Sequence, residues 1–569
     1  MGIGLTEEHR ALAASVRGLA GRTVEHRALA GQGLLGLHLP EEHGGQGYGL
    51  VELCVALEVL GELRVAGPYL PVVLASAALA RSARPASGLL RGLADGSLTA
   101  AVALGPLALG SSGADLFLVP HGDGWALLDR AGVRAEPAEC VDLDRDLCTV
   151  TAVAGRDVQP ERLLGPVPVR ELAAVLLGAD ACGTAAWAVG TAAAHAKTRE
   201  QFGRPIGQFQ GVKHRVAAAL VALEQARAAV WDAARALDAP HVGEPQAPGG
   251  LGDDVRLAVG VAAVLGPDAA VRCAADAIQV LGGIGYTFEH DAHRHYRRAL
   301  SGRMLAGDPG PWAEQVAELA LAGARRAMEP DLPEESVPLR EAIRAEAESL
   351  RREEPLARLG RFAREGWIMP YLPRPWGRAA TPLEQVIIHQ EFRALKRPNL
   401  GIAAWAVPSI VTYGTPEQQE RFLPRTFTGE LVWCQLFSEP GAGSDLAGLS
   451  TRATRVAGGW SLTGQKIWTS LAQYAHWGIC LARTPPTGPS TRGSRTSWWT
   501  CPPPASRSGR SRRSTGTRSS TRCSSTTSSS RTTWWWARWT AAGGWPATRS
   551  PTSGSRSATP GGRAPGTPT

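Results

Sequence analysis

Two short segments combine small residues, hydroxyl groups and an aromatic ring in a spacing that suits a bound cofactor. Residues 436–445 read LFSEPGAGSD, and residues 458–470 read GGWSLTGQKIWTS. The first predicts an apolar strand followed by a loop whose small residues leave main-chain N–H groups unshielded, so that a flat or anionic group can approach them closely. The second predicts a turn at Gly458-Gly459 and a strand ending with an indole face for stacking and hydroxyls for hydrogen bonds. Taken singly, the glycines could also form a surface loop and the tryptophan could belong to a core.

A second pair of motifs precedes these in the chain. Residues 197–217 read KTREQFGRPIGQFQGVKHRVA and place Arg199 at the end of one predicted helix, with another helix opening after Gln208-Phe209-Gln210. Residues 278–290 read IQVLGGIGYTFEH, in which Gly282-Gly283 is a usual helix stop. An arginine fork suits a pyrophosphate, and N–H groups exposed by glycines suit further anionic oxygens. Alone, the arginine would be interpreted as a surface charge and the double glycine as a helix cap.

Together these motifs closely resemble those of the acyl-CoA dehydrogenase family, over about residues 1–325 and again over 336–484. The resemblance implies FAD as the cofactor. It implies that one set of residues surrounds the flavin ring: Gln435, Leu436 and Ser438 along it, Ser444 near flavin and substrate thioester, Trp468 against the isoalloxazine, and Ser470 at its central-ring nitrogen. It also implies a second set that reaches across a subunit interface to FAD held mainly by the other copy of the fold: Arg199, Gln201, Phe202, Gln279, Gly282 and Gly283.

The resemblance further implies the reaction and the partners. The expected activity is oxidation of an acyl-CoA to the trans-2-enoyl-CoA, in fatty acid or steroid side-chain oxidation, with electrons passed from FADH2 to an electron-transfer flavoprotein. We expect the two copies to pair within the chain and the chain to form a homo-oligomer. The alternatives are a flavin-binding protein of the same fold without dehydrogenase activity and a nucleic-acid-binding protein that uses a basic tail. We expect no nucleic acid and no membrane among the partners.

The reaction needs a carboxylate base, and the first half of the chain offers none at the family's two positions. Counting back from Arg199, one position falls on Ala173, and counting forward from Gly283, the other falls on Ala306. Glu171 lies two residues from the first position and is a weak candidate. The first half is therefore interpreted as a non-catalytic partner that completes the FAD site of the second.

These motifs belong to two copies of one large domain. Residues 33–60 and 366–393 match at an offset of 333, which aligns His43-Gly44-Gly45 with Trp376-Gly377-Arg378 and Glu58 with Glu391. The helical pattern predicts helices before each strand section, and further helices after the first one. The predicted helices are 6–30, 48–82, 167–235, 254–281, 340–365 and 382–395, and the strand sections begin at 97 and 430.

The predicted fold is α+β, with one degenerate full copy followed by a truncated second copy. The β domain of copy one is called degenerate because it reads PLALGSSGADLFLV, without Glu-Pro-Gly. Each complete copy has an N-terminal helical domain, a small β-barrel-like middle domain and a C-terminal helical bundle. The predicted boundaries are 1–98, 99–165 and 166–325 for the three domains of copy one, 326–338 for a linker, 339–429 and 430–484 for the helical and β domains of copy two, and 485–569 for an aberrant disordered tail.

Composition separates this tail from the rest. From Thr484 onward there are 13 arginines and no Asp, Glu or Lys, so the net charge of +8 divides into +13 for the tail and −5 for the body. The body has no basic leader followed by an apolar core, no run of about 18 uncharged apolar residues and no CxxC pair among its scattered cysteines. These features predict a cytoplasmic location.

A reading-frame shift explains the tail better than a nucleic-acid-binding arm. Residues 484–569 contain no Leu, Ile, Val, Phe, Tyr or Met, so they cannot form a core of their own. Tryptophan has the single codon TGG, and consecutive TGG codons read one base earlier give valine. The stretch TTWWWARWT at 532–540 then hides Val-Val-Gly, and Ser550 to Ser555 can give Leu-Ala-Asn-Glu-Arg-Val, whose glutamate would be the missing base.

Overall fold

The computed structural model describes residues 5–19, 25–153, 158–159, 162–239, 250–326, 330, 332–456, 459–484, 494–500, 510–512 and 518–523. The chain divides into two compact units between Asp331 and Leu332, inside the predicted linker, and each unit is described by itself. Unit 1 holds copy one and unit 2 holds copy two. The predicted codon shift at 532–540 and at 550–555 lies outside the described residues.

Unit 1 begins with short helices that build a helical N-terminal domain. The first is capped by Thr6, whose side chain accepts from His9 N, and carries Glu7 and Glu8 in its first turn, where acidic side chains favour the helix dipole. The third and fourth are almost entirely buried and apolar. The helices are α1 (Glu7–Gly18), α2 (His26–Gly31), α3 (Leu50–Glu62), α4 (Tyr69–Ala80) and α5 (Ser87–Ala94).

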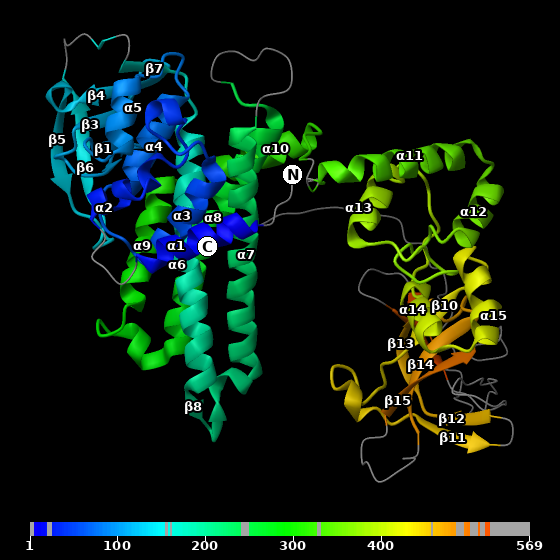
Figure 1. Ribbon diagram of the computed structural model, residues 1–569. Helices are drawn as coiled ribbons and strands as arrows, with labels where there is room; N and C mark the ends of the chain where they lie inside the picture. The colour runs from blue at the N-terminus through cyan, green and yellow to red at the C-terminus, as the bar shows by residue number, and fades with distance from the viewer. Residues whose placement is uncertain are drawn as a thin grey trace, which may run out of the picture. The chain divides into compact units, whose positions relative to one another are not determined.

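A seven-stranded sheet follows, in the order β5-β6-β2-β1-β3-β4-β7. It is antiparallel except where β1 and β3 run parallel. Helices α4 and α5 lie beside this sheet (Figure 1). The strands are β1 (Ala100–Ala103), β2 (Ala108–Leu109), β3 (Leu116–His121), β4 (Gly124–Asp129), β5 (Val133–Ala138), β6 (Leu147–Ala152) and β7 (Leu163–Gly165).

Long helices complete unit 1. Helices α6 and α7 run together away from the sheet, to the hairpin of β8 and β9 that joins them (Figure 1). Gly178 and Gly266 let α6 and α8 approach closely, since a Cβ on Gly266 would lie 2.9 Å from Gly178 Cα. The elements are α6 (Val169–Thr198), β8 (Glu200–Gln201), β9 (Arg204–Pro205), α7 (Gln210–Asp238), α8 (Asp253–Leu281), α9 (Ala292–Ala306) and α10 (Gly310–Leu321).

Helices α6 and α8 are long and apolar enough to pass a length-and-composition test for a membrane span, but α6 is the central core helix of unit 1. Of its most apolar window 89% is buried, against 61% for α8, and α6 carries the buried, ion-paired Asp180. Such helices are typical of a protein interior. Seven cysteines are free, and all of them but Cys140 are buried: Cys54, Cys140, Cys148, Cys182, Cys273, Cys434 and Cys480.

Unit 2 repeats the helical beginning. Thr381 and Thr415 cap two of its helices through capping boxes with Glu384 and Gln418. Two clusters of buried apolar residues fill this part, one around Trp367 and Phe392 and another around Trp433 and Phe427. The helices are α11 (Val337–Arg352), α12 (Pro355–Arg364), α13 (Pro382–Glu391), α14 (Ala403–Tyr413) and α15 (Pro416–Phe427).

The strands of unit 2 form a sheet in the order β10-β14-β11-β12, with β15 added on β14, and a second sheet in the order β13-β17-β16. β11 and β12 pair antiparallel on either side of the predicted turn, whose Gly458 lies outside the described residues, while the KIWTS strand, β13, pairs with β17. The strands are β10 (Trp433–Leu436), β11 (Arg452–Val456), β12 (Gly459–Thr463), β13 (Lys466–Ser470), β14 (Trp477–Arg483), β15 (Ser494–Thr500), β16 (Arg510–Arg512) and β17 (Arg518–Cys523).

Strands β15, β16 and β17 lie in the segment 485–569, for which the sequence predicts a disordered tail. The lack of aliphatic side chains prevents the segment from forming a hydrophobic core of its own. It does not exclude strands added to existing ones, because pairing uses main-chain groups and Thr and Trp favour strands. The rest of the segment lies outside the described residues.

The repeat is visible in the positions of equivalent elements. β10 begins 333 residues after β1, and β13 begins 333 residues after β5. The N-caps of α3 and α13, Gly49 and Thr381, differ by 332. The turn before the helix is one residue shorter in copy two, because Gly45 N donates to Pro40 O whereas Gly377 N donates to Pro373 O. The predicted alignment of Glu58 with Glu391 is therefore off by one residue, and Gln390 is its structural equivalent.

Candidate functional site

In unit 2 the structure brings the two sequence motifs of the predicted flavin site together. The loop after β10 and the start of β13 are joined by a main-chain hydrogen bond from Ile467 N to Ser438 O, 2.9 Å long. β10 is the end strand of its sheet. The loop itself turns tightly, since Glu439 N donates to Ala442 O at 2.9 Å.

A buried ion pair reinforces this junction. Lys466 Nζ lies 2.7 Å from Glu439 Oε1 and also donates to Phe437 O at 2.9 Å, and both side chains are at most 4% exposed. Glu439 further accepts from Ser450 Oγ at 2.7 Å and from Thr451 N at 2.9 Å. Burial alone would raise the pKa of Glu439. The hydrogen bonds, that of Lys466 first, instead hold this pKa well below its usual range.

β13 presents its aromatic residue in an unusual backbone conformation. Its pairing with β17 shifts register between Lys466 and Thr469, and Trp468 has φ +59° with a side chain 63% exposed. Such a bulge aims a side chain in a direction that a regular strand would not allow. Thr469 is fully buried, and among the described residues its Oγ1 has no hydrogen-bond partner. Ser470, the last residue of β13, is half-buried.

The other residues of the predicted flavin set differ in exposure. Gln435 and Ser438 are half-buried and Ser444 is exposed. The Leu436 side chain is 2% exposed and packs in a core cluster with Cys434 and Cys480. A contact between Leu436 and a flavin therefore requires its main chain, because its side chain points into the core.

In unit 1 the second predicted set lies towards one end of the helical domain. Arg199 caps α6, Gln201 is in β8 and Phe202, at φ +54°, is 94% exposed. Arg215 near the start of α7 pairs with Asp276 near the end of α8, which brings the end of α8 to the same region. Gln279, Gly282 and Gly283 at that end are all exposed.

The chemistry of both sets fits FAD. No heavy atom lies within 4 Å of where a Cβ would stand on Gly441, Gly443, Gly282 or Gly283, so the main chain is open at these positions. Unit 2 offers an exposed indole beside hydroxyl groups for a ring system. Unit 1 offers an exposed guanidinium and a glycine turn for a pyrophosphate. Each unit is described by itself, so the joining of the two sets into one site is part of the proposal below.

Copy one keeps a remnant of the flavin loop. Gly110 and Ser111 stand 333 residues before Gly443 and Ser444. They line a cavity of unit 1 whose walls come from the α3–α4 region and whose floor is charged. Its lining comprises Leu57, Leu60, Val65, Gly67, Pro68, Tyr69, Leu70, Pro71, Leu109, Gly110, Ser111, Arg145, Asp146, Asp180 and Arg298.

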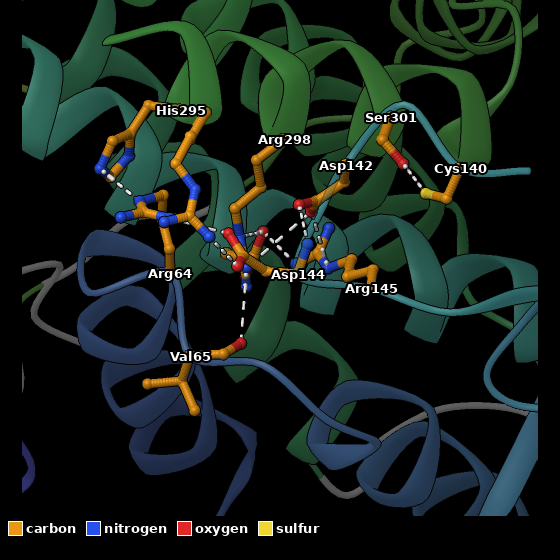
Figure 2. Close-up of polar contacts among 11 residues, drawn as sticks. Arg64, Val65, Cys140, Asp142, Asp144, Arg145, His295, Arg298 and Ser301 are labelled. Atoms are coloured by element: carbon orange, nitrogen blue, oxygen red, sulfur yellow. Dashed lines mark hydrogen bonds and ion pairs between the residues drawn. The ribbon is translucent and has the colours of Figure 1, made fainter. Parts of the chain in front are cut away.

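The charged floor is part of a cluster that joins the sheet to the helices (Figure 2). Asp180 of α6 lies 2.7 Å from Arg298 Nη2 and 2.5 Å from Arg145 Nη2, and all three side chains are at most 5% exposed. Arg64 donates to His295 Nε2 at 3.2 Å and lies 2.8 Å from an oxygen of Asp144. Figure 2 shows Arg298 of α9 reaching towards Asp142 of the β5–β6 connection, and His295 of α9 lying against Arg64.

The structure bears on the search for a base in copy one. Ala173 is buried and Ala306 half-buried, and Glu171 lies half-buried in the first turn of α6. Two carboxylates that sequence reasoning missed line the cavity, Asp146 and Asp180, and Asp180 is the buried one in α6. Burial alone would raise its pKa, but Arg145 and Arg298 hold it at about 2. A carboxylate stabilised so strongly as an anion is a poor proton acceptor.

Sequence reasoning also missed Glu439 and Lys466. Both were inside the quoted motifs, so their presence was visible, but no spacing rule pairs residues 27 apart in a loop and a strand. Arg145, Asp180 and Arg298 come from three separate elements and share no local pattern. The available signal was the single charge, Asp180, in the stretch 172–194 of α6, which is otherwise uncharged.

Comparison with known proteins gives matches over most of the chain. The model described as "Acyl-CoA dehydrogenase, N-terminal domain" matches twice, at residues 6–86 and 332–430. The models for the middle and C-terminal domains of the same family match at 434–528 and 171–321. The double match confirms that the helical N-terminal domain is repeated. The middle-domain match extends past Thr484 into the segment predicted to be out of frame.

Individual relatives agree with this. The chain is 43% identical over 485 residues to the acyl-CoA dehydrogenase FadE34 of Mycobacterium tuberculosis, a match covering 82% of this chain and 66% of FadE34. It is 33% identical over 279 residues to IpdE2 of the same organism, covering 49% of this chain and 80% of IpdE2. Among solved structures, the ChsE4-ChsE5 complex from M. tuberculosis is similar at 25% identity and TM-score 0.49, covering 57% of this chain and 100% of that chain.

Proposed function

The chain belongs to the acyl-CoA dehydrogenase family, and from this premise we propose that copy two, completed by copy one, forms one FAD-dependent site that oxidises an acyl-CoA to the trans-2-enoyl-CoA. FAD is the cofactor of the chain. The observation that carries the proposal is the junction in unit 2, where Ile467 N bonds to Ser438 O and joins the glycine loop to the strand with Trp468 and Ser470.

Each set of residues has a role in this proposal. Trp468 covers the isoalloxazine with its exposed indole, Ser470 hydrogen-bonds the central ring, and Gln435, Leu436 and Ser438 line the ring from the β10 side. Ser444 lies at the thioester. From copy one, the pyrophosphate is held by Arg199, Gln201, Phe202, Gln279, Gly282 and Gly283. When bound, FAD accepts the hydride that leaves the β carbon of the substrate.

The proton at the α carbon must go to a carboxylate, and we propose that copy one does not supply this carboxylate. Ala173 and Ala306 stand at the family's two positions, and Asp180 is held ionised by two arginines. Glu171 stays a weak candidate. We therefore assign copy one the role of a non-catalytic half that contributes to cofactor binding.

We place the base of copy two in the codons for Thr552 and Ser553, where the frame one base earlier can give glutamate. On this proposal the chain as written binds FAD but has little or no dehydrogenase activity, and the frame-restored chain transfers electrons to an electron-transfer flavoprotein. Pairing of the two copies within one chain, formation of a homo-oligomer and a cytoplasmic location belong to the same proposal.

A second candidate is a flavin-binding protein of this fold without dehydrogenase activity, which the ion-paired Asp180 and the two alanines of copy one favour. Two measurements test the proposal, and the second of them separates the two candidates. The first is cofactor identity: protein purified and reconstituted with flavins should release FAD, and finding FMN or no flavin would overturn the proposal.

The second measurement is anaerobic bleaching of the bound flavin by a panel of acyl-CoA thioesters, with the written chain beside the frame-restored chain. The proposal expects fast bleaching only in the restored chain. Fast bleaching of the written chain would place the base elsewhere, with Glu171 the first residue to change. Failure of the restored chain with every thioester would favour the non-catalytic candidate. Deleting residues 484–569 tests the nucleic-acid-binding alternative. We expect that neither the parent chain nor the deleted chain binds nucleic acid.

A further inference from the structure

We propose that Glu439 and Lys466 are a positioning pair for the flavin site, a role that rests on the function proposed above. Neither residue is expected to touch the cofactor. Their effect is to hold the glycine loop and β13 at a fixed separation, so that Ser438 and Ser444 on one segment and Trp468 and Ser470 on the other meet the same ring system.

The contacts show why the pair can do this. Lys466 Nζ bonds both to the carboxylate of Glu439 at 2.7 Å and to the main-chain oxygen of Phe437 at 2.9 Å, so it binds the loop at two points. Glu439 in turn bonds Ser450 Oγ and Thr451 N, which follow the loop. One buried pair thus links the start of the loop, its end and the first residue of β13.

The pair also supports the backbone that presents Trp468. The residues Trp468 and Leu471 have φ +59° and +61°, a region that side chains other than glycine rarely adopt. Between them Thr469 is fully buried. Buried Lys466 on one side and buried Thr469 on the other fix the bulge, so a loosened Lys466 lets the indole turn away from the ring.

Copy one provides an internal comparison. The positions 333 residues before Glu439 and Lys466 hold Pro106 and Val133, and those before Trp468 and Ser470 hold Ala135 and Pro137. Copy one nevertheless forms a seven-stranded sheet whose strand β5 begins at Val133. A β domain of this fold therefore forms without the pair. The ion pair is absent in the copy that lacks the flavin-facing tryptophan and serine.

The test compares four variants of the full chain with the parent: Lys466→Met, Lys466→Arg, Glu439→Gln, and the double variant Glu439→Gln with Lys466→Met. Glu391→Gln is the matched control, because Glu391 is a half-buried ion-pair partner of Arg340 and Arg344 on the helical part of unit 2. The readouts are FAD affinity from flavin fluorescence, the visible circular dichroism of bound flavin, and thermal unfolding of the FAD-free protein.

We expect Lys466→Met and Glu439→Gln to weaken FAD binding on the order of tenfold or more and to change the flavin dichroism, as for other displaced supporting groups. Lys466→Arg should restore much of both. The double variant, which buries no lone charge, should unfold near the parent temperature and still bind FAD poorly. Glu391→Gln should lower the unfolding temperature without changing the flavin signals.

Two results would overturn the inference in different ways. Parent-like FAD affinity and dichroism in the double variant would mean that the pair serves stability alone. A parent chain that binds no FAD would overturn the proposed function itself, and the positioning role with it. If Lys466→Met fails to fold, the double variant and Lys466→Arg decide the question.

Discussion

Asp180 of α6 and Arg298 of α9 form a buried ion pair, with Arg298 Nη2 2.7 Å from Asp180 Oδ1 and both side chains at most 5% exposed. Arg145 from the β5–β6 connection shares the same carboxylate at 2.5 Å. One carboxylate therefore joins the β domain of unit 1 to two of its long helices.

Removing this carboxylate should destabilise unit 1 strongly. Asp180→Asn keeps the shape but leaves two buried guanidinium groups without their counter-charge, and we expect a loss of about 3–5 kcal/mol in the free energy of unfolding. Urea unfolding followed by circular dichroism measures it. The control is Asp268→Asn, which breaks a half-exposed pair with Arg303 and should cost at most about 0.5 kcal/mol. A loss below about 1 kcal/mol for Asp180→Asn would contradict the expected role.

Unit 1 should lose stability as the pH falls from 7 to 5. Burial, with Arg64 next in effect, lowers the pKa of His295 to about 2, and burial with Arg81 lowers the pKa of His38 to about 3. In the unfolded chain both histidines bind a proton as the pH falls through about 6.5, whereas in the folded chain they stay neutral. At pH 5 this difference lowers the free energy of unfolding by about 2 kcal/mol for each histidine.

The histidine contribution can be separated by substitution. His295→Gln should reduce the loss in the free energy of unfolding between pH 7 and 5 by about 2 kcal/mol, because the unfolded variant no longer takes up the proton that His295 binds in the unfolded parent. His121→Gln, at an exposed position of β3, should leave the pH dependence as in the parent. Unfolding curves at four pH values check this, and an unchanged slope in His295→Gln would show that His295 does not resist protonation.

Arg199 should contribute to FAD binding through its charge. Arg199→Ala should weaken binding by about 1.5–3 kcal/mol, roughly 10- to 150-fold in Kd, the range of a hydrogen bond to a charged group. Isothermal titration with FAD measures this. Arg170→Ala, an exposed arginine in the first turn of α6, is the matched control and should bind FAD like the parent. Equal affinities for both variants would remove Arg199 from the cofactor site.

Restoring the reading frame near codon 485 should recover an apolar helical domain and a catalytic carboxylate. Changing the restored glutamate at codons 552 and 553 to glutamine should reduce the rate of flavin bleaching by about 10²- to 10⁴-fold, the usual contribution of a general base. The coding DNA gives the first answer, because the absence of an open frame one base back would end the hypothesis. Full activity of the glutamine variant would place the base elsewhere.

The repeated order of helices and strands could be predicted from sequence because it depends on local periodicity. The predicted helix 382–395 and the strand section from 430 correspond to α13 and β10. Residues 6–30 contain two helices instead of one, α1 and α2. The glycine loop and the KIWTS strand could also be predicted as cofactor-binding segments, because their glycine, hydroxyl and indole groups indicate that chemistry by residue type alone.

Contacts between distant residues could not be predicted in this way. The pairing of Glu439 with Lys466, and of Asp180 with Arg298, depends on how elements pack and leaves no periodic signal. The direction of the Leu436 side chain depends on which face of β10 meets the core, and four residues are too few to settle that by alternation. The strands β15 to β17 were missed because side chains were considered and main-chain pairing was not.

The single linker between α10 and α11 has a consequence for expression and titration. Because one messenger RNA encodes both halves, they are always synthesised in equal numbers, whereas halves made from two genes depend on balanced translation. Copy one lacks the glutamate, lysine, tryptophan and serine that copy two has in its loop and β13, so the proposed function gives the chain two family folds and one flavin site. A titration should therefore saturate at one FAD for each polypeptide.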